Sequence, residues 1–404
     1  MNHTAKVQLL LVEDNPMDAM LVQRLLENLD QELPVATHLE PDAETALAEL
    51  QRNPYDLILL DYQLPGASGL DLLAEIDKLP KSDQPAVIML TATGNEAVAV
   101  EAMKRGAKDY LRKDDLAAPS LTRAVLSALT QKRMQDQLTR YHTQIETDLR
   151  MARQLQHAML PQHFPLFPST ATAATSALQF HARYISTVEL GGDFYDVFPL
   201  SDTTAGVFIC DVMGHGVRAA LVTAMIRALI EEFQFVAHDP SQFLTGINHA
   251  LLTLLKRMDD PLFATACYLI VDVAHGELRY ATAGHPLPFH LPHEPGTVAV
   301  LPPPTDGLGP ALGLFDGAAY PAAHHPLAAQ DLVLLFTDGL FEVLDDHDNE
   351  FGEDRLLAAA REHRALPPPQ LLDQLINQCR TYSATGEFAD DVCLIAVEAT
   401  KLIP

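Results

Sequence analysis

The feature that most constrains the fold is an alternation of strand-like segments with helical patterns over the first 120 residues. Strand composition appears at residues 7–12, 35–39, 55–60, 86–90 and 108–112, and helical patterns lie between these segments. Strands that alternate with helices in this way are typical of a doubly wound parallel sheet. The sequence therefore predicts an α/β domain built on a five-stranded parallel sheet.

The ends of these predicted strands carry residues suited to chemistry. In a doubly wound sheet, ligands bind beyond the carboxyl ends of the strands. Three carboxylates at one edge repel one another unless a divalent cation lies between them, and a nearby lysine and hydroxyl complete a site suited to a phosphoryl group. One aspartate at a strand end is usually a helix cap, but five such residues at successive strand ends are hard to obtain by chance. The five are Glu13, Asp14, Asp61, Thr91 and Lys113.

This segment resembles the CheY-like receiver domain of bacterial response regulators, through the motifs LLLVEDN, DLILLDYQLPGASGL, VIMLTA and GAKDYLRKD. The resemblance implies that a cognate histidine kinase phosphorylates Asp61. It also implies that Glu13, Asp14 and Asp61 hold Mg²⁺, that Thr91 and Lys113 contact the phosphoryl oxygens, and that Tyr110 is an aromatic switch. One departure is Asp114, which follows Lys113 where the family usually has proline. A cis peptide bond is costly before any other residue, so the loop geometry stays open at this point.

A long helix is predicted after this domain. Residues 121–160 contain no glycine and no proline, and their apolar side chains recur mostly at spacings of three and four. The apolar stripe of such a helix needs a partner. A parallel coiled coil in a homodimer is one interpretation, and packing back onto the chain's own domains is the other, because the heptads are imperfect. The predicted organisation is a receiver domain at 1–125, a helical linker at 126–160 and a second domain at 161–404.

The rest of the chain has strands in runs and helices in runs, which indicates an α+β fold with helices covering packed sheets. Its informative residues are acidic and lie at strand boundaries: Asp193 in GGDFYD, Asp211 before VMGHG, Asp338 before Gly339, and Asp390 with Asp391 before VCLIAV. One Asp-Gly pair alone is more often a simple turn. Four acidic turns together fit hard oxygen ligands around two divalent cations. Carboxylates suit Mg²⁺ or Mn²⁺ better than zinc, which prefers cysteine and histidine.

These motifs resemble the SpoIIE-type branch of the metal-dependent protein serine/threonine phosphatases. The resemblance covers about residues 150–400 through ARQLQHAMLP, GGDFYDVF, DVMGHGVRAAL, YATAGHPLP, ALGLF, LVLLFTDGLFE and ADDVCLI. It implies a β-sandwich flanked by helices in αββα order, with a metal site at one edge. The metal ligands that it implies are Asp193, Asp211, the carbonyl of Val212, Asp338 and Asp390, with Asp196 and Asp391 as further candidates.

Two histidines and one cysteine need separate interpretations. His215 in GHG is a candidate general acid for the leaving serine oxygen. The same motif can equally be a turn that enters a helix. His285 in AGHP is expected to be structural, and Cys393, where relatives often have threonine, is expected to alter packing.

Together the two resemblances imply a two-component response regulator with a hydrolase output. The reaction would be Mg²⁺- or Mn²⁺-dependent hydrolysis of phosphoserine or phosphothreonine on a partner protein. The family suggests an anti-sigma-factor antagonist with a STAS domain as that partner. Phosphorylation of Asp61 adds about two negative charges and would control the output. The sequence does not distinguish activation from inhibition.

Composition restricts the partners further. The formal net charge is −27, which opposes nucleic-acid binding because phosphate backbones require cationic side chains. There is no run of 18 or more apolar residues, so no membrane span is expected. The four cysteines form neither a zinc pair nor a disulfide framework, and a reducing cytoplasm is the expected location.

Two other functions stay open. GGDF at residues 191–194 is similar to the GGDEF signature of diguanylate cyclases, although Tyr195 follows it and a cyclase does not account for the TDG and ADD turns. A non-catalytic scaffold, controlled by phosphorylation and only sequestering its partner, is the alternative from a different class. A scaffold predicts the loss of metal-binding carboxylates, whereas all four positions are filled.

Overall fold

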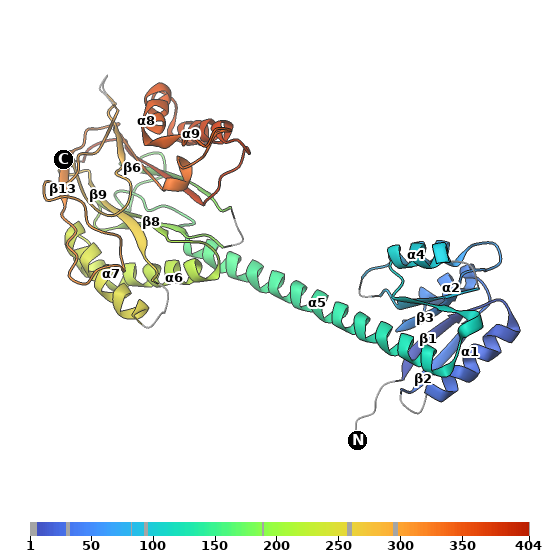
Figure 1. Ribbon diagram of the computed structural model, residues 1–404. Coiled ribbons are helices and arrows are strands. Elements are labelled where there is room, and N and C mark those ends of the chain that lie inside the picture. The colour runs from blue at the N-terminus through green and yellow to red at the C-terminus, as the bar shows by residue number, and fades with distance from the viewer. Residues whose placement is uncertain are drawn as a thin grey trace. The chain divides into compact units, whose positions relative to one another are not determined.

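The structure is a computed structural model that describes residues 6–29, 33–81, 83–92, 96–187, 190–256, 261–293 and 298–403. The chain divides into two compact units, Met1–Glu146 and Thr147–Pro404 (Figure 1). The first is an α/β unit and the second an α+β unit, so the predicted fold classes are confirmed.

The first unit is a parallel sheet with the strand order β2-β1-β3-β4-β5 and helices on both faces. One apolar core joins the sheet to α1 and α5, and another joins its opposite face to α2 and α3. Burial on both faces explains why the central strands are continuous apolar runs. The elements are β1 (Val7–Val12), α1 (Pro16–Leu29), β2 (Val35–Glu40), α2 (Ala43–Leu50), β3 (Leu57–Asp61), α3 (Gly69–Asp77), β4 (Ala86–Thr91), α4 (Glu96–Lys104) and β5 (Asp109–Arg112).

Short polar motifs define where helices of this unit begin. Asn15 Oδ1 accepts a hydrogen bond from the Met17 N–H at 2.9 Å, and Pro16 occupies the first position of α1, where its missing N–H costs nothing. At the start of α3, Ser68 and Asp71 form a reciprocal capping box. These caps fix the turns that follow β1 and β3, and therefore the strand ends that carry the carboxylates.

Helix α5 (Ala118–Met159) is 42 residues long and confirms the predicted helix. Its exposed apolar side chains include Met134, Leu138, Tyr141 and Ile145. Its first turns are buried in the core of the first unit through Leu121, Ala124, Val125, Ala128 and Leu129. Beyond Leu129 these apolar side chains are exposed, and the coiled coil stays a prediction.

The second unit is a sandwich of two five-stranded antiparallel sheets, in the orders β13-β10-β9-β8-β7 and β12-β11-β14-β15-β6. The first sheet contains β7 (Asp193–Pro199), β8 (Thr204–Val212), β9 (Ala264–Asp272), β10 (Glu277–Ala283) and β13 (Ala323–Pro326). The second contains β6 (Leu178–Ile185), β11 (Phe289–Leu291), β12 (Ala299–Val300), β14 (Leu332–Phe336) and β15 (Val392–Ala399). Side chains from both sheets share one core, as in aligned sandwiches.

Two helices cover each outer face of the sandwich. Helices α6 (Val217–Glu232) and α7 (Pro240–Leu255) pack on the first sheet. Helices α8 (Gly352–His363) and α9 (Pro368–Tyr382) pack on the second sheet through a separate core. This is the predicted αββα order, and it leaves the ends of the strands open for a site.

Candidate functional site

The carboxyl edge of the first sheet gathers the predicted acidic residues around one lysine. Glu13, Asp14 and Asp61 have ligand oxygens within 4.8 Å of one another. Lys113 Nζ lies 2.7 Å from Glu13 Oε2 and 3.0 Å from Asp61 Oδ2. It also lies 3.0 Å from Asp18 Oδ2, a partner that the sequence did not suggest.

The electrostatics of this edge favour a cation. Burial raises the pKa of both Glu13 and Asp61, against the opposing effect of Lys113. Burial also disfavours the charged lysine, but its carboxylate partners leave the pKa of Lys113 above its ordinary value. One ammonium among several carboxylates leaves negative charge uncompensated. The donor set of three carboxylates therefore fits Mg²⁺, which prefers hard oxygen ligands.

The remaining predicted residues of this edge lie at the ends of the next strands. Thr91 is the last residue of β4 and is buried, whereas Tyr110 on β5 is 42% exposed. Lys113 opens a short 3-10 helix, Lys113–Asp115. Its bond to Asp114 is not cis, since Phe167–Pro168 is the cis peptide bond among the described residues. The turn is therefore built without the proline.

In the second unit, two aspartates lie opposite each other on neighbouring strands of the sandwich sheet that contains β7 and β8. Asp193 on β7 is directly paired with Asp211 on β8 in the antiparallel register. Like charges directly opposite each other destabilise a sheet. Asp193 is buried, with 2% of its surface exposed. Such a pair requires a proton or a cation between the carboxylates.

The second sheet brings two more acidic turns to the same end of the sandwich. Asp338 follows β14, and Asp390 with Asp391 precedes β15, the strand paired with β14. Electrostatic repulsion couples Asp193 to Asp211, Asp211 to Asp338, and Asp338 to Asp390. We call these four residues the carboxylate row. Its members come from segments almost 200 residues apart, as the sequence predicted.

The pKa values within the row are raised. For Asp193, burial is the main cause and repulsion from Asp211 the next, and together they raise its pKa well above the usual range. Burial and repulsion from Asp338 raise the pKa of Asp211 to about 7. Burial and the Asp390 carboxylate also raise the pKa of Asp338.

No three members of the row lie within 4.8 Å of one another; among the described residues, the trios that do are Glu13, Asp14 and Asp61 in the receiver and His38, Glu40 and Glu49. Asp193 lies opposite Asp211, and Asp211 is repelled by both Asp338 and Asp390, so several carboxylates share one region without forming a single tight trio. Such a group suits two cations that share ligands better than one cation at a single centre. The residues present therefore fit a pair of divalent ions.

Two glycines allow the backbone to approach the row closely. A Cβ atom on Gly192 would lie 2.5 Å from the carbonyl oxygen of Val212, and one on Gly339 would lie 2.1 Å from the carbonyl oxygen of Asp391. Side chains at these positions would displace the backbone on which the aspartates stand. The carbonyl of Val212 thus lies close to the loop that carries Asp193, and its coordination of a metal stays a prediction.

Asp391 supports the loop that leads into β7. Its Oδ1 accepts a hydrogen bond from the Thr187 N–H at 2.9 Å, and its Oδ2 accepts one from the Gly192 N–H at 2.7 Å. Asp390 is exposed beside it and accepts a hydrogen bond from the Asp391 N–H at 2.8 Å. The pair therefore divides: Asp390 presents a carboxylate to the row, and Asp391 holds backbone.

Thr337 joins the two sheets at the row and was missed from the sequence. Its hydroxyl donates to Asp193 Oδ2 at 2.6 Å and accepts from the Cys393 N–H at 2.9 Å. Thr337 is fully buried. It fixes one carboxylate oxygen of Asp193, the residue paired with Asp211 in the sheet. The motif LVLLFTDGLFE contained this residue, but its partner lies 144 positions away.

Gln156 is a second residue missed from the sequence. It lies near the end of α5 and is buried. Its Nε2 donates to the Gly191 carbonyl at 2.8 Å, and its Oε1 accepts from the Gly191 N–H at 3.2 Å. The last turn of α5 therefore holds the glycine loop that precedes Asp193.

Three other predicted residues lie outside the row. Asp196 is buried next to Arg227 of α6, with 3.5 Å between Oδ2 and Nε, so it forms an ion pair away from the row. His215 is exposed in the turn before α6, whose N-cap is Gly216. His285 is buried, with Nδ1 2.8 Å from Thr265 Oγ1, as expected for a structural histidine.

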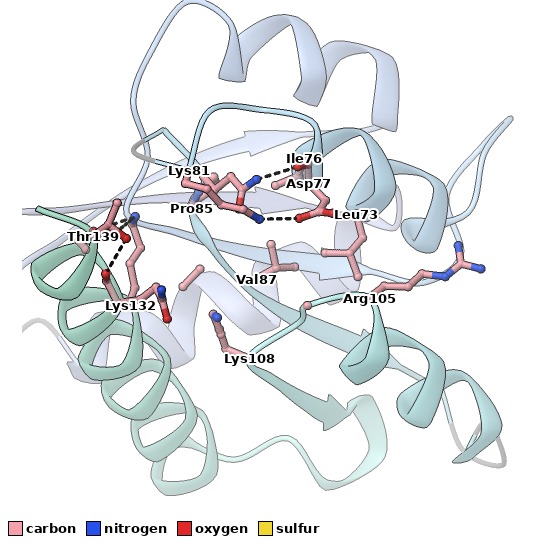
Figure 2. Close-up of a pocket in the computed structure, with 15 residues that line it drawn as sticks. Leu73, Ile76, Asp77, Lys81, Pro85, Val87, Arg105, Lys108, Lys132 and Thr139 are labelled. Carbon is pink, nitrogen blue, oxygen red and sulfur yellow. Dashed lines mark hydrogen bonds and ion pairs between the residues drawn. The ribbon is translucent and has the colours of Figure 1, made fainter. Parts of the chain in front are cut away.

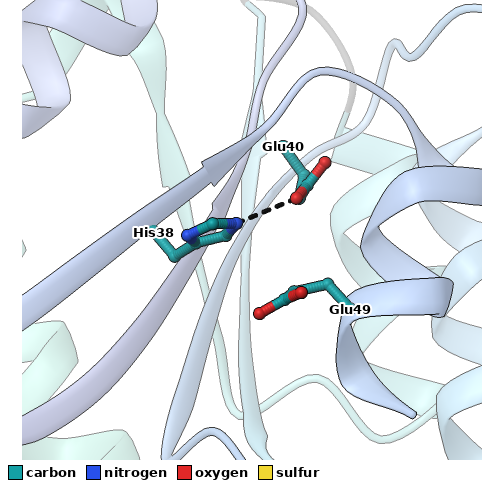
Figure 3. Close-up of side chains that lie close together, drawn as sticks. All are labelled: His38, Glu40 and Glu49. Carbon is teal, nitrogen blue, oxygen red and sulfur yellow. Dashed lines mark hydrogen bonds and ion pairs between the residues drawn. The ribbon is translucent and has the colours of Figure 1, made fainter. Parts of the chain in front are cut away.

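A further cluster, at the edge of the receiver sheet, consists of His38, Glu40 and Glu49 (Figure 3). His38 Nε2 lies 2.9 Å from Glu40 Oε1. Glu49 already accepts hydrogen bonds from Tyr55 and Asn53 at 2.7 and 2.8 Å. These contacts account for the cluster as a polar network of the surface.

Two findings concern the chain as a whole. Among the described residues, no helix has both the length and the apolar character needed to cross a bilayer. All four cysteines, Cys210, Cys267, Cys379 and Cys393, are buried and unpaired.

Comparison with family models separates the same two regions. Residues 9–125 match the model described as "Response regulator receiver domain". Residues 201–400 match the model described as "Stage II sporulation protein E (SpoIIE)".

Two curated proteins of Bacillus subtilis (strain 168) are similar to the chain. "Phosphoserine phosphatase RsbP" is 25% identical over 252 residues, which are 62% of this chain and 57% of that protein. "Phosphoserine phosphatase RsbU" is 25% identical over 199 residues, which are 49% of this chain and 55% of that protein. The chain thus spans little more than half the length of either relative.

A solved structure shares the fold of the second unit. The "SiaA-PP2C domain of Pseudomonas aeruginosa" superposes with a TM-score of 0.53 at 24% identity and covers 64% of this chain and 98% of that domain.

Proposed function

Since this chain joins a response regulator receiver domain to a domain of the stage II sporulation protein E family, we propose that it is a metal-dependent protein serine/threonine phosphatase under receiver control. The observation that carries the proposal is the carboxylate row, in which aspartates from two sheets repel one another at one edge of the sandwich. The proposed boundaries are 1–125 for the receiver, 126–160 for the linker and 161–404 for the phosphatase.

The residues that would hold two Mg²⁺ or Mn²⁺ ions are Asp193, Asp211, Asp338, Asp390 and the carbonyl of Val212. Bound there, the ions would make hydroxide available near neutral pH and offset charge on the phosphoryl oxygens. Thr337 orients Asp193, and Asp391 and Gln156 hold the loop before it. His215, exposed in the turn after Asp211, is the proposed general acid that would donate a proton to the leaving serine oxygen.

The proposed substrate is phosphoserine or phosphothreonine on a folded partner protein. Two relatives carry the name phosphoserine phosphatase, which supports this substrate class. An anti-sigma-factor antagonist with a STAS domain is the specific partner that we propose. The proposed location is the cytoplasm, consistent with four unpaired buried cysteines.

Control would come from a histidine kinase that phosphorylates Asp61, with Mg²⁺ held by Glu13, Asp14 and Asp61. Helix α5 supports this route, because its first turns belong to the receiver core and its last turn holds Gly191. The exposed apolar stripe on the same helix supports a homodimer through a coiled coil.

The decisive experiment measures phosphate release by the 404-residue chain with Mn²⁺, from p-nitrophenyl phosphate and from a phosphorylated STAS-domain protein. Release from both is expected. Asp211→Ala should lower the rate of phosphate release by more than the roughly 10–100-fold that follows loss of a residue that orients metal ligands. The matched control is Asp306→Ala, an exposed aspartate outside the row. Binding of the STAS-domain protein without any phosphate release would instead establish the scaffold.

A further inference from the structure

The receiver contains a cavity on the edge of the sheet opposite to Asp61. It has a volume of about 280 Å³ and lies between the end of α3, the start of β4, the turn before β5 and the middle of α5 (Figure 2). Asp61 ends β3, whereas Ala86 and Val87, which line the cavity, begin β4. The cavity is therefore separate from the phosphoryl site, which lies at the carboxyl ends of the strands.

The lining is cationic in a strongly acidic protein. Four of its fifteen residues are lysine or arginine, against 27 in a chain of 404 with a net charge of −27. The four are Lys81, Arg105, Lys108 and Lys132, and two carboxylates, Asp77 and Asp136, accompany them.

Three of these cations already have carboxylate partners. Lys81 pairs with Asp77 at 3.1 Å and Lys132 with Asp136 at 3.0 Å. Arg105 pairs with Glu101 at 2.7 Å, and Figure 2 shows its side chain pointing away from Lys108.

Lys108 differs from the other three. It is half-buried, it has no carboxylate within ion-pair distance in the part of the chain that the structure describes, and in Figure 2 it extends toward α5. Lys132, on that helix, has only 14% of its side chain exposed. Among the described residues, the ammonium of Lys108 has no carboxylate partner, and the ammonium of Lys132 belongs to a largely buried side chain.

The rest of the lining divides into an apolar wall and a set of neutral donors. Leu73, Ile76, Pro85 and Val87 form the wall, and Gln84, Gln135 and Thr139 supply amide and hydroxyl groups. Ligand pockets are typically apolar with a few placed polar groups, and the volume of this one lies just below the usual range of about 300–1,000 Å³. Lysine serves as a point charge for phosphate.

We propose that this cavity binds a small phosphorylated organic anion, with the phosphoryl group between Lys108 and Lys132 and the organic part against the apolar wall. A ligand there joins the receiver body to α5 just beyond Leu129, where the helix leaves the receiver core. Occupancy would therefore stiffen residues 132–139 of the helix. This ligand site is additional to the kinase input at Asp61 and does not depend on the phosphatase reaction.

The test is calorimetric titration of the 404-residue chain in EDTA at pH 8, with phenylphosphonate as the probe. Phenylphosphonate combines a dianionic head with an apolar ring and has no ester bond to hydrolyse. EDTA removes divalent cations that would hold it at either carboxylate site. We expect it to bind at least tenfold more tightly than inorganic phosphate or benzoate. Equal binding of benzoate would show that the phosphoryl group is not recognised, and no binding at millimolar concentration would overturn the site.

Variants locate the probe. Lys108→Ala and Lys132→Gln should each weaken binding at least tenfold, and Lys108→Arg should restore part of it. The matched control is Lys78→Ala, an exposed lysine of the same domain that pairs with Glu75 outside the cavity. Unchanged affinity in both cavity variants, with the fold intact by circular dichroism, would refute the proposal.

Hydrogen exchange provides an independent location. Phenylphosphonate should slow amide exchange in residues 132–139, and this effect should disappear in Lys108→Ala. Slowing confined to the segments around Asp193 and Asp211 would place the probe at the carboxylate row instead and would also refute the proposal.

Discussion

Gln156 forms two hydrogen bonds with the backbone of Gly191, donating to its carbonyl at 2.8 Å and accepting from its N–H at 3.2 Å. One side chain of α5 thus satisfies both polar groups of the residue two positions before Asp193. Because the contact is buried, water cannot replace it without opening the loop. The last turn of the linker helix and the loop that leads to the carboxylate row are therefore parts of one local structure within the second unit.

The first prediction concerns this contact. Gln156→Ala would leave the buried N–H and the buried carbonyl of Gly191 without partners. As long as the loop stays closed, each unpaired group destabilises the fold by about 1–3 kcal/mol. We expect the Mn²⁺ concentration for half-maximal turnover to rise about 10–100-fold, as for loss of groups that orient metal ligands. Gln154→Ala, an exposed glutamine on the same helix, is the control. Equal metal dependence in the two variants would contradict the role of Gln156.

The second prediction concerns metal-free stability. A carboxyl group with a raised pKa in the folded state lowers the free energy of unfolding as the pH rises. The loss accumulates between its unfolded pKa of about 3.9 and its folded pKa. At pH 8 the full cost from Asp211 is present, since its pKa is about 7. Asp211→Asn should therefore raise the thermal midpoint in EDTA by a few degrees.

Metal should reverse that order. Mn²⁺ should raise the midpoint of the parent chain and have little effect on Asp211→Asn, because a ligand that binds the folded state stabilises it. Calorimetry at pH 8 with and without Mn²⁺ measures both effects. Asp306→Asn removes a charge outside the row and should behave like the parent. A variant that is less stable than the parent in EDTA would contradict the repulsion.

The third prediction separates the hydroxyl of Thr337 from its shape. Thr337→Val keeps the volume but removes the hydrogen bonds to Asp193 and from Cys393. The buried Cys393 N–H would lose its partner, at a cost of about 1–3 kcal/mol. We expect Thr337→Val to lower the turnover and to lower the affinity for Mn²⁺, measured from the Mn²⁺ dependence of turnover. Thr337→Ser should restore both. Failure of serine to rescue would show that the methyl group, not the hydroxyl, matters.

The fourth prediction is a pH dependence of stability from His285. Burial lowers the pKa of His285 to about 3, whereas an unfolded histidine titrates near 6.5. Between these values the unfolded chain binds a proton that the folded chain does not, so this contribution to stability falls as the pH falls. From pH 7 to pH 5 the loss is about 2 kcal/mol.

Urea unfolding of His285→Gln measures that contribution by difference. The variant should lose about 2 kcal/mol less than the parent between pH 7 and pH 5. His238→Gln, which changes an exposed histidine of the same unit, should keep the parent's slope. Identical slopes for the parent and His285→Gln would refute the buried neutral state.

The fifth prediction addresses receiver control. Acetyl phosphate with Mg²⁺ should change the turnover of the parent chain and leave Asp61→Asn unchanged. Because a complete switch from 1:99 to 99:1 requires about 5.5 kcal/mol, a partial change of several-fold is expected from one phosphoryl group. Turnover that is the same for both proteins, with and without acetyl phosphate and at every substrate concentration, would remove receiver control from the proposal.

The sequence predicted the parts of the sites that lie at strand ends. Asp61 ends a continuous apolar strand and Asp338 lies two residues beyond another, and that local pattern is visible without a structure. The predicted sandwich was also correct, but strand β7 was not predicted, and Asp193 was placed only at a strand boundary.

The supporting residues could not be predicted in this way. Thr337 and Gln156 are ordinary members of a strand end and a helix, and their partners lie 144 and 35 positions away. No periodicity records such pairings. The cavity beside Lys108 depends in the same way on four separate segments, which only the fold brings together.

Thr337 also has a mechanical consequence. It hydrogen-bonds to Asp193 in one sheet and to Cys393 in the other, at the end of the sandwich where the acidic side chains gather. The two sheets cannot separate at this end without breaking the hydrogen bonds of Thr337 and so disturbing Asp193, a proposed cation ligand. Cohesion of the two sheets and the proposed capacity to retain ions therefore depend on the same hydrogen bonds.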